Sequence, residues 1–184
     1  IECGCVISDA GAMNTFTRLL PQDVARQHGY DRLLANVKPS IGHLGVYIGL
    51  AATAAELGLP RTNFWIYPDN DYDGTLAKFE ADPTGPFPVV YLSFPSAKDP
   101  DFERRHPGKA TVEIVAPAPY SIFAPWAGQT WGKRGEDYEA LKQHYGERLL
   151  EYLYDKLPQL RGRVDYWEVS TPLSDRWQRC AWQQ

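Results

Sequence analysis

The chain has 184 residues, of which 43% are hydrophobic and 13% aromatic, and its formal net charge at pH 7 is −4. This composition fits about one folded domain with a sizeable core and excludes a wholly disordered chain. The sequence has no long basic run, so a nucleic-acid partner is not expected. It also has no signal peptide and no apolar run of about 18 residues, so no membrane span is predicted.

The cysteines and histidines favour neither a disulfide framework nor a metal site. Cys3, Cys5 and Cys180 are too few and too irregularly spaced for a disulfide scaffold or a four-cysteine zinc site. The odd number of cysteines favours a reducing compartment. The four histidines are scattered without metal-ligand spacing, so we expect no bound metal. His43 lies at the start of a predicted strand. It is a candidate for a pocket, and the alternative is a solvent-facing or hydrogen-bonded histidine.

The N-terminal segment predicts a strand followed by helices. Residues 2–8 fit a short strand, and residues 10–20 fit a helix that begins after Asp9, a good N-cap type. Pro21 interrupts this helix, and a second one is predicted over residues 22–36. The region 19–37 fits either a helix that covers the domain or an amphipathic contact with a membrane surface.

The rest of the chain predicts several strands and one long helix. Strands are expected over residues 44–50, 62–67, 89–94, 110–116 and 164–169, and a helix over 136–157 that Pro158 ends. Glycines alternate with apolar residues at 44–50, where they allow a flat group to approach or mark strand bends. Residues 68–74 fit an ordinary Asx-type turn, with a calcium loop as the alternative. This order of elements predicts an α+β fold with a mixed, largely antiparallel sheet covered by helices.

Five segments in a fixed order resemble one enzyme family. They are Val-Ile-Ser-Asp-Ala-Gly at 6–11, the strand at 41–50, the run at 91–120, Trp-Gly-Lys-Arg-Gly at 131–135 and Val-Ser-Thr-Pro-Leu-Ser at 169–174. The run at 91–120 contains Asp-Pro, Pro-Gly-Lys, a β run and Pro-x-Pro in the order of a substrate-domain signature. The chain thus resembles the FAD-dependent carotenoid desaturase and isomerase family, and is most similar to its retinol saturase branch.

The resemblance implies a substrate domain of the kind found in FAD-dependent amine-oxidase-like enzymes. It implies an oxidoreductase that saturates, desaturates or isomerises C=C bonds of a retinoid- or carotenoid-like isoprenoid, with FAD as cofactor. It places Ser8, Asp9, Ala10 and Gly11 beside the diphosphate or adenine side of the flavin. Candidates for lining an apolar pocket are Tyr47, Tyr91, Phe94 and Phe123, each with plain core packing as its alternative. No catalytic acid–base pair stands out.

Two features of the family are absent from the sequence. The family binds FAD through a Gly-x-Gly-x-x-Gly turn, which this chain does not contain. Residues 175–184 hold no glycine, although the family has a Gly-rich segment there. We therefore predict that residues 1–174 are a substrate-domain segment of a larger flavoenzyme and that 175–184 are a divergent tail. A chain that begins with Ile1 and contains one methionine does not fit a complete reading frame.

The expected partner is an apolar polyene, and the expected location is the cytoplasm or the surface of a membrane. A non-catalytic module that binds an apolar ligand or a protein, without any cofactor, is the alternative function. It predicts a folded chain that binds lipid saturably and carries no flavin.

Overall fold

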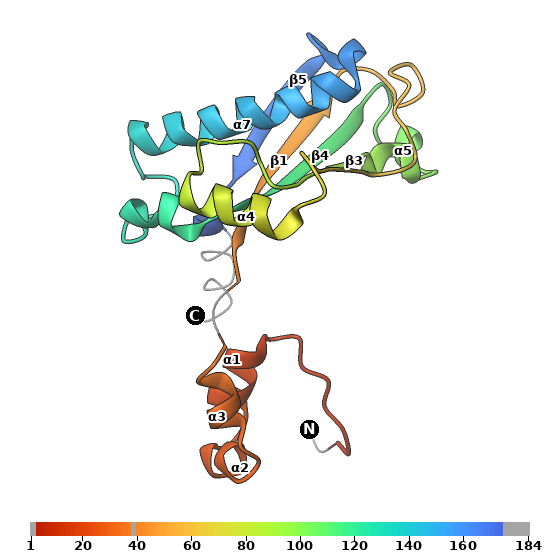
Figure 1. The fold of residues 1–184 in the computed structure, drawn as a ribbon. Helices are drawn as coiled ribbons and strands as arrows, with labels where there is room; N and C mark the ends of the chain where they lie inside the picture. Colours follow the sequence, from red (N-terminus) through yellow and green to blue (C-terminus); the bar gives the residue numbers. More distant parts are fainter. Residues whose placement is uncertain (1–2, 38–39, 175–184) are drawn as a thin grey trace. The chain divides into compact units, whose positions relative to one another are not determined.

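A computed structural model describes residues 3–37 and 40–174 of the chain. The chain divides into two compact units, residues 1–40 and residues 41–184. The first unit is helical, with short elements in the red and orange part of Figure 1. Its elements are α1 (Ala12–Asn14), the π-helical turn η1 (Thr15–Leu19), α2 (Gln22–Gln27) and α3 (Tyr30–Leu34).

Three predictions for this first unit are wrong. Residues 3–8 form no strand, because no other described segment pairs with their backbone groups. The helix predicted over 22–36 is split, since Gly29 adopts the left-handed conformation (φ 72°) between α2 and α3. The preceding helix begins at Ala12 after Gly11, whose φ is 80°, and not directly after Asp9. The predicted interruption at Pro21 is confirmed, because Leu20 is extended (ψ 142°).

The second unit is built on a five-stranded open sheet. The strands are β1 (Gly42–Leu50), β2 (Phe64–Ile66), β3 (Val90–Ser93), β4 (Ala110–Ala118) and β5 (Val164–Ser170). Their order is β2-β3-β4-β1-β5, and every neighbouring pair is antiparallel. The predicted α+β class is therefore confirmed.

Period-2 alternation decides which side chains enter the core. Every second residue of β4, from Ala110 to Ala118, is buried, and the residues between them are partly exposed. In β1, Leu44, Val46, Ile48 and Leu50 are buried on the same face. Strong alternation of this kind fixes the pairing register, because a slip of one residue would expose the whole apolar set.

Helix α7 (Glu136–Lys156) packs on this buried face. It contacts β3, β4 and β5 and runs along the sheet in Figure 1. The helix starts after Gly135, carries three acidic residues in its first turn and Lys156 in its last, and ends before Pro158. Gly146 lets β5 approach closely, since a Cβ at this position would lie 2.8 Å from atoms of both Trp167 and Val169.

The remaining elements complete the second unit. Helix α4 (Tyr72–Ala81) is capped by the Asp71 side chain and joins the core through Phe79, whose ring lies 5.3 Å from that of Phe87. The other described elements of this unit are short helical turns, namely α5 (Pro95–Lys98), α6 (Phe102–Arg105), η2 (Tyr120–Ile122), η3 (Ala124–Trp126) and η4 (Pro158–Leu160).

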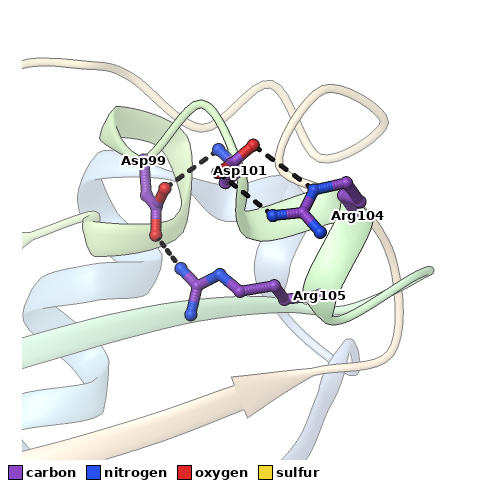
Figure 2. A network of polar contacts seen from close by, with 4 residues as sticks. All are labelled: Asp99, Asp101, Arg104 and Arg105. Atoms are coloured by element: carbon purple, nitrogen blue, oxygen red, sulfur yellow. Dashed lines mark hydrogen bonds and ion pairs between the residues drawn. The ribbon is translucent and has the colours of Figure 1, made fainter.

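The connection between β3 and β4 is held by polar contacts at its surface. Figure 2 shows Asp99 accepting from the backbone N–H of Asp101 (2.9 Å) and pairing with Arg105. Asp101 pairs in turn with Arg104, at 3.2 Å. These groups are at the surface, so each pair contributes little stability alone, and together they connect the residue after α5 with α6.

Candidate functional site

The second face of the sheet lies opposite the face on which α7 packs, and its side chains range from buried Ser93 to exposed Trp65. We call it the open face, and it comprises His43, Gly45, Tyr47, Gly49, Trp65, Tyr91, Ser93, Thr111, Glu113, Val115, Tyr166, Glu168 and Ser170. Tyr47 is 43% exposed, Trp65 63% and Tyr166 61%. Exposed aromatic side chains gathered on one surface mark an interaction site more often than a random surface.

Strand pairing sorts these residues into rows that run across the sheet. One row is apolar and aromatic, because Trp65 pairs with Tyr91 and Tyr91 pairs with Val115. The rings of Trp65 and Tyr91 lie 4.6 Å apart. The row continues to Gly45 in β1, which pairs with Val115. A flat apolar ligand laid on this row would contact two aromatic side chains and a valine.

The next row is polar. Ser93 pairs with Glu113, Glu113 pairs with Tyr47, and Tyr47 pairs with Glu168. Partners directly opposite on one face have Cβ atoms about 4.5–5.5 Å apart, so these side chains are neighbours. The open face thus has an aromatic row directly beside a row with two carboxylates.

Gly45 makes room for the Tyr47 ring. A Cβ at position 45 would lie 3.0 Å from the Tyr47 hydroxyl and 2.8 Å from Oγ of Ser170. Tyr47 therefore lies along its own strand, over the glycine. The sequence left two roles open for the alternating glycines, and at Gly45 the flat group that approaches is the chain's own tyrosine. Oγ of Ser170 is buried there and has no hydrogen-bond partner within residues 3–37 and 40–174.

Two of the polar groups in this row are already engaged. Glu168 accepts a hydrogen bond from the Tyr166 hydroxyl at 2.9 Å, and this bond raises the pKa of Tyr166 above its ordinary value. Ser93 accepts from Nζ of Lys98 at 3.0 Å.

The four aromatic residues predicted to line a pocket lie in two different places. Tyr47 and Tyr91 are both on the open face, Tyr47 in the polar row and Tyr91 in the adjacent aromatic row. Phe94 and Phe123 are 0% exposed and belong to the helix-packed core, where Phe94 meets Phe64 edge-on at 5.5 Å and Phe123 lies 6.1 Å from Tyr145. Phe94 directly follows β3 and lies an odd number of positions after Tyr91, so strand alternation places these two side chains on opposite faces.

The residues predicted to contact the flavin lie in the first unit. Ser8, Asp9, Ala10 and Gly11 are exposed and line an open hollow of about 900 Å³, most of whose other lining residues are apolar. The Ser8 hydroxyl bonds that of Thr15 at 2.7 Å. These residues lead into a helix of only three residues, and no lysine or arginine lines the hollow. The described residues therefore do not by themselves fit the diphosphate of FAD, which favours a helix N-terminus and Gly-rich backbone.

In the acidic loop before α4, two aspartate side chains accept hydrogen bonds from backbone N–H groups of the same segment. Asp71 accepts from the backbone N–H of Gly74 at 3.0 Å, and Asp69 accepts from the N–H of Asp71 at 2.8 Å. This is the geometry of an Asx turn and a helix cap. Within the described ranges, no group of three or more His, Cys, Asp or Glu side chains lies together as a metal site would require.

Buried Arg134 is a feature that the sequence did not single out as a site. It is 8% exposed, donates to the Tyr138 hydroxyl at 3.1 Å and to the Leu173 carbonyl at 3.5 Å, and leaves its Nε–H without a partner in the described part of the chain. Tyr138 also bonds the Thr171 hydroxyl at 2.8 Å. These contacts tie the start of α7 to the turn after β5, so Arg134 positions the Thr-Pro-Leu-Ser segment.

A second hollow, of about 470 Å³, lies beside the β3–β4 connection. Its lining includes Arg61, Asp99, Glu103 and Lys109, so both signs of charge are present. A charged lining does not suit an apolar ligand. The open face, with its aromatic row, is therefore the better candidate for one.

Fold and site together define an α+β segment with one face packed by helices and one face presenting aromatic side chains. Over 180 residues, or 96% of the chain, it is 35% identical to the human protein named all-trans-retinol 13,14-reductase and 34% identical to the protein of that name from Macaca fascicularis. It is also 32% identical over 178 residues to a Danio rerio protein named inactive all-trans-retinol 13,14-reductase. The chain spans 30% of the length of each of these relatives.

These similarities confirm the relation to the retinol saturase branch that the sequence motifs indicate. No protein-family model matches the chain, and no solved structure matches it. Among the helices of residues 3–37 and 40–174, none has the length and apolarity needed to cross a membrane. The tail predicted over 175–184 lies outside the described residues.

Proposed function

We propose that this chain is the substrate-domain segment of an FAD-dependent oxidoreductase that acts on C=C bonds of a retinoid-like isoprenoid. The observation that carries the proposal is the aromatic row on the open face, with exposed Trp65 and half-buried Tyr91, in a chain similar over 96% of its length to proteins named retinol reductases. Saturation is the favoured direction, because the related proteins are named reductases.

The open face supplies the wall of the substrate site in this proposal. Trp65, Tyr91 and Val115 offer flat apolar surface to a conjugated chain, and burying that chain against them would stabilise the complex by about 25 cal/mol per Å² of apolar area. A polyene has few polar atoms, so shape and apolar contact dominate its recognition. Phe94 and Phe123 would support this wall from behind, within the core.

FAD would supply the redox chemistry in the longer protein, with Ser8 to Gly11 beside its diphosphate or adenine side as the family resemblance implies. Because the described residues do not complete that site, its remaining groups must come from outside them. What this chain's own residues do is bind the substrate and keep water from its reacting bonds.

A chimaeric enzyme tests the proposal. The segment of the human reductase that matches this chain is replaced by residues 1–174, and reduction of all-trans-retinol is followed by chromatography. We expect activity, and we expect Trp65→Ala to lower kcat/KM about tenfold through lost contact area. Tyr72→Ala, an exposed tyrosine at the start of α4, is the matched control and should leave kcat/KM unchanged. A folded chimaera that retains flavin but does not reduce retinol would contradict the proposal.

A non-catalytic binding module is the second candidate. The Danio rerio relative named inactive supports it, since similarity at this level extends to a protein that lacks the activity in its name. This candidate predicts saturable binding of an apolar ligand to the isolated chain, together with a folded but inactive chimaera.

A further inference from the structure

Glu113 and Tyr47 are two uncommitted polar groups of the polar row on the open face. They are cross-strand partners in β4 and β1, and the Tyr47 side chain extends from this pair over Gly45, so that its hydroxyl lies toward the aromatic row. Within residues 3–37 and 40–174, neither the Glu113 carboxylate nor the Tyr47 hydroxyl makes a hydrogen bond or an ion pair. The other polar side chains of that row, Glu168 and Ser93, are engaged by Tyr166 and Lys98.

This pair has complementary hydrogen-bonding capacity. An ionised carboxylate only accepts hydrogen bonds, whereas a phenol also donates one. An alcohol does both, so its O–H can donate to Glu113 while its oxygen accepts from Tyr47. A hydrocarbon can use neither member of the pair, and an ester, which has no donor hydrogen, can only accept from Tyr47.

The neighbouring row explains why such a pair is useful. Glu113 is half-buried and lies two residues before Val115 on the same face of β4. Val115 pairs with Tyr91, and Tyr91 pairs with Trp65. When an apolar ligand covers this surface, the carboxylate loses water and the complex is destabilised unless a donor replaces it. A ligand with an apolar chain and a terminal hydroxyl covers the surface and supplies that donor.

We infer that Glu113 and Tyr47 bind the hydroxyl end of an amphipathic polyene alcohol whose apolar chain lies over Val115, Tyr91 and Trp65. This inference rests on the proposed function and adds to it the groups that select an alcohol over an ester or a hydrocarbon. Gly45 contributes by leaving room for the Tyr47 ring to lie flat beside the ligand. Glu113 and Tyr47 are thus specificity-determining residues.

Binding of two ligands to the full chain tests the inference. All-trans-retinol and retinyl acetate share the polyene, but the acetate has no hydroxyl donor. Their dissociation constants are measured from retinoid fluorescence, for the unchanged chain and for the variants Glu113→Gln, Tyr47→Phe and Glu80→Gln. The last is a matched control on α4, away from the open face.

We expect the unchanged chain and Glu80→Gln to prefer retinol by about tenfold. In Glu113→Gln the neutral amide is a weaker acceptor, so the preference should fall below about threefold. Tyr47→Phe should reduce it in the same direction. Both altered residues are at the surface or half-buried, so thermal unfolding should be nearly unchanged and confirms that each variant is folded.

The outcomes separate the two proposals. If the unchanged chain binds neither ligand saturably, the hydroxyl-binding role of this face is overturned, whereas the proposed function is decided separately by the activity of the chimaera. If it binds both ligands equally, or if the preference for retinol persists in Glu113→Gln and Tyr47→Phe, the hydroxyl-binding role is overturned and the apolar site stands.

Discussion

The two faces of the sheet are made by alternate residues of the same strands, yet they differ in composition and in burial. The packed face carries branched aliphatic side chains and alanines that are almost fully buried beneath α7. The open face carries tyrosines, a tryptophan, glycines and two glutamates, and its largest side chains are exposed. The first set is what a stable core needs. The second set contributes little to folding, and a binding role explains its composition better.

Aromatic residues close together in the sequence can lie on different faces of the sheet. Tyr91 and Phe94 are three positions apart and equally aromatic, but one faces outward beside Trp65 and the other lies at 0% exposure in the core. An aromatic residue in a strand is therefore a binding candidate only when its strand position points it away from the packed face. Substitutions on the packed face should therefore lower the free energy of unfolding, and substitutions on the open face should weaken ligand binding.

The largest effect is expected in the core. Phe123→Ala removes a fully buried ring that packs on Tyr138 and Tyr145, and should lower the free energy of unfolding by about 3–5 kcal/mol. Tyr47→Ala, on the open face, is the control and should change it by about 1 kcal/mol or less. Denaturant unfolding of both variants measures the difference. If Phe123→Ala leaves stability unchanged and weakens retinoid binding, Phe123 lines the substrate site as the sequence also allowed.

Much of the fold was predictable from residue periodicity. The helix expected over 136–157 is observed as Glu136–Lys156, and the strand expected over 110–116 is observed as Ala110–Ala118. A long apolar stripe predicts the helix and strict alternation predicts the strand, because each pattern repeats over the whole element. The short N-terminal elements lack such signals. Gly29 breaks a helix whose apolar spacing continues across it, and residues 3–8 have strand-like composition but no partner.

The site was predictable only in part, because it depends on which strands are neighbours. Tyr47 and Tyr91 were candidates from composition, but Glu113, Trp65 and Tyr166 were not. The alternation of Val112, Glu113 and Ile114 placed the glutamate opposite the core, and this signal could have found it. That Glu113 lies beside Tyr47 follows from the pairing of β4 with β1, which no local pattern specifies. The role of Ser8 to Gly11 stays a prediction.

The next largest effect is expected where α7 meets β5. Gly146→Ala places a methyl group against the rings of Trp167 and the side chain of Val169, and should lower the free energy of unfolding by about 1–3 kcal/mol. Alanine has the higher helix propensity, so any loss reports the close packing and not the helix itself. Gly128→Ala is the control, since no atom lies within 4 Å of the added Cβ. Equal stability of both variants would show that α7 can move away from the sheet freely.

A glycine on the open face should behave differently. Gly45→Ala meets the Tyr47 hydroxyl and Oγ of Ser170, which are the ends of side chains that can rotate away. We therefore expect a loss of about 0.5 kcal/mol or less in denaturant unfolding, with weaker retinol binding as Tyr47 is displaced. Gly49→Ala is the control on the same strand, where the nearest atom is 3.9 Å away. A loss as large as that of Gly146→Ala would mean that the open face is packed as tightly as the core.

The smallest effect concerns the proton of Tyr166. Its hydrogen bond to the Glu168 carboxylate raises its pKa, because ionisation would break the bond and bring two negative charges together. Glu168→Gln should therefore lower that pKa toward the ordinary value, while stability at neutral pH changes little. An ultraviolet titration of the phenolate band, with Tyr166→Phe as the reference that identifies this tyrosine among the others, measures the shift. An unchanged pKa in Glu168→Gln would mean that Glu168 is not held by Tyr166. It would then be as free as Glu113 to bind a ligand hydroxyl, so this small shift also decides whether one carboxylate or two are available beside Tyr47.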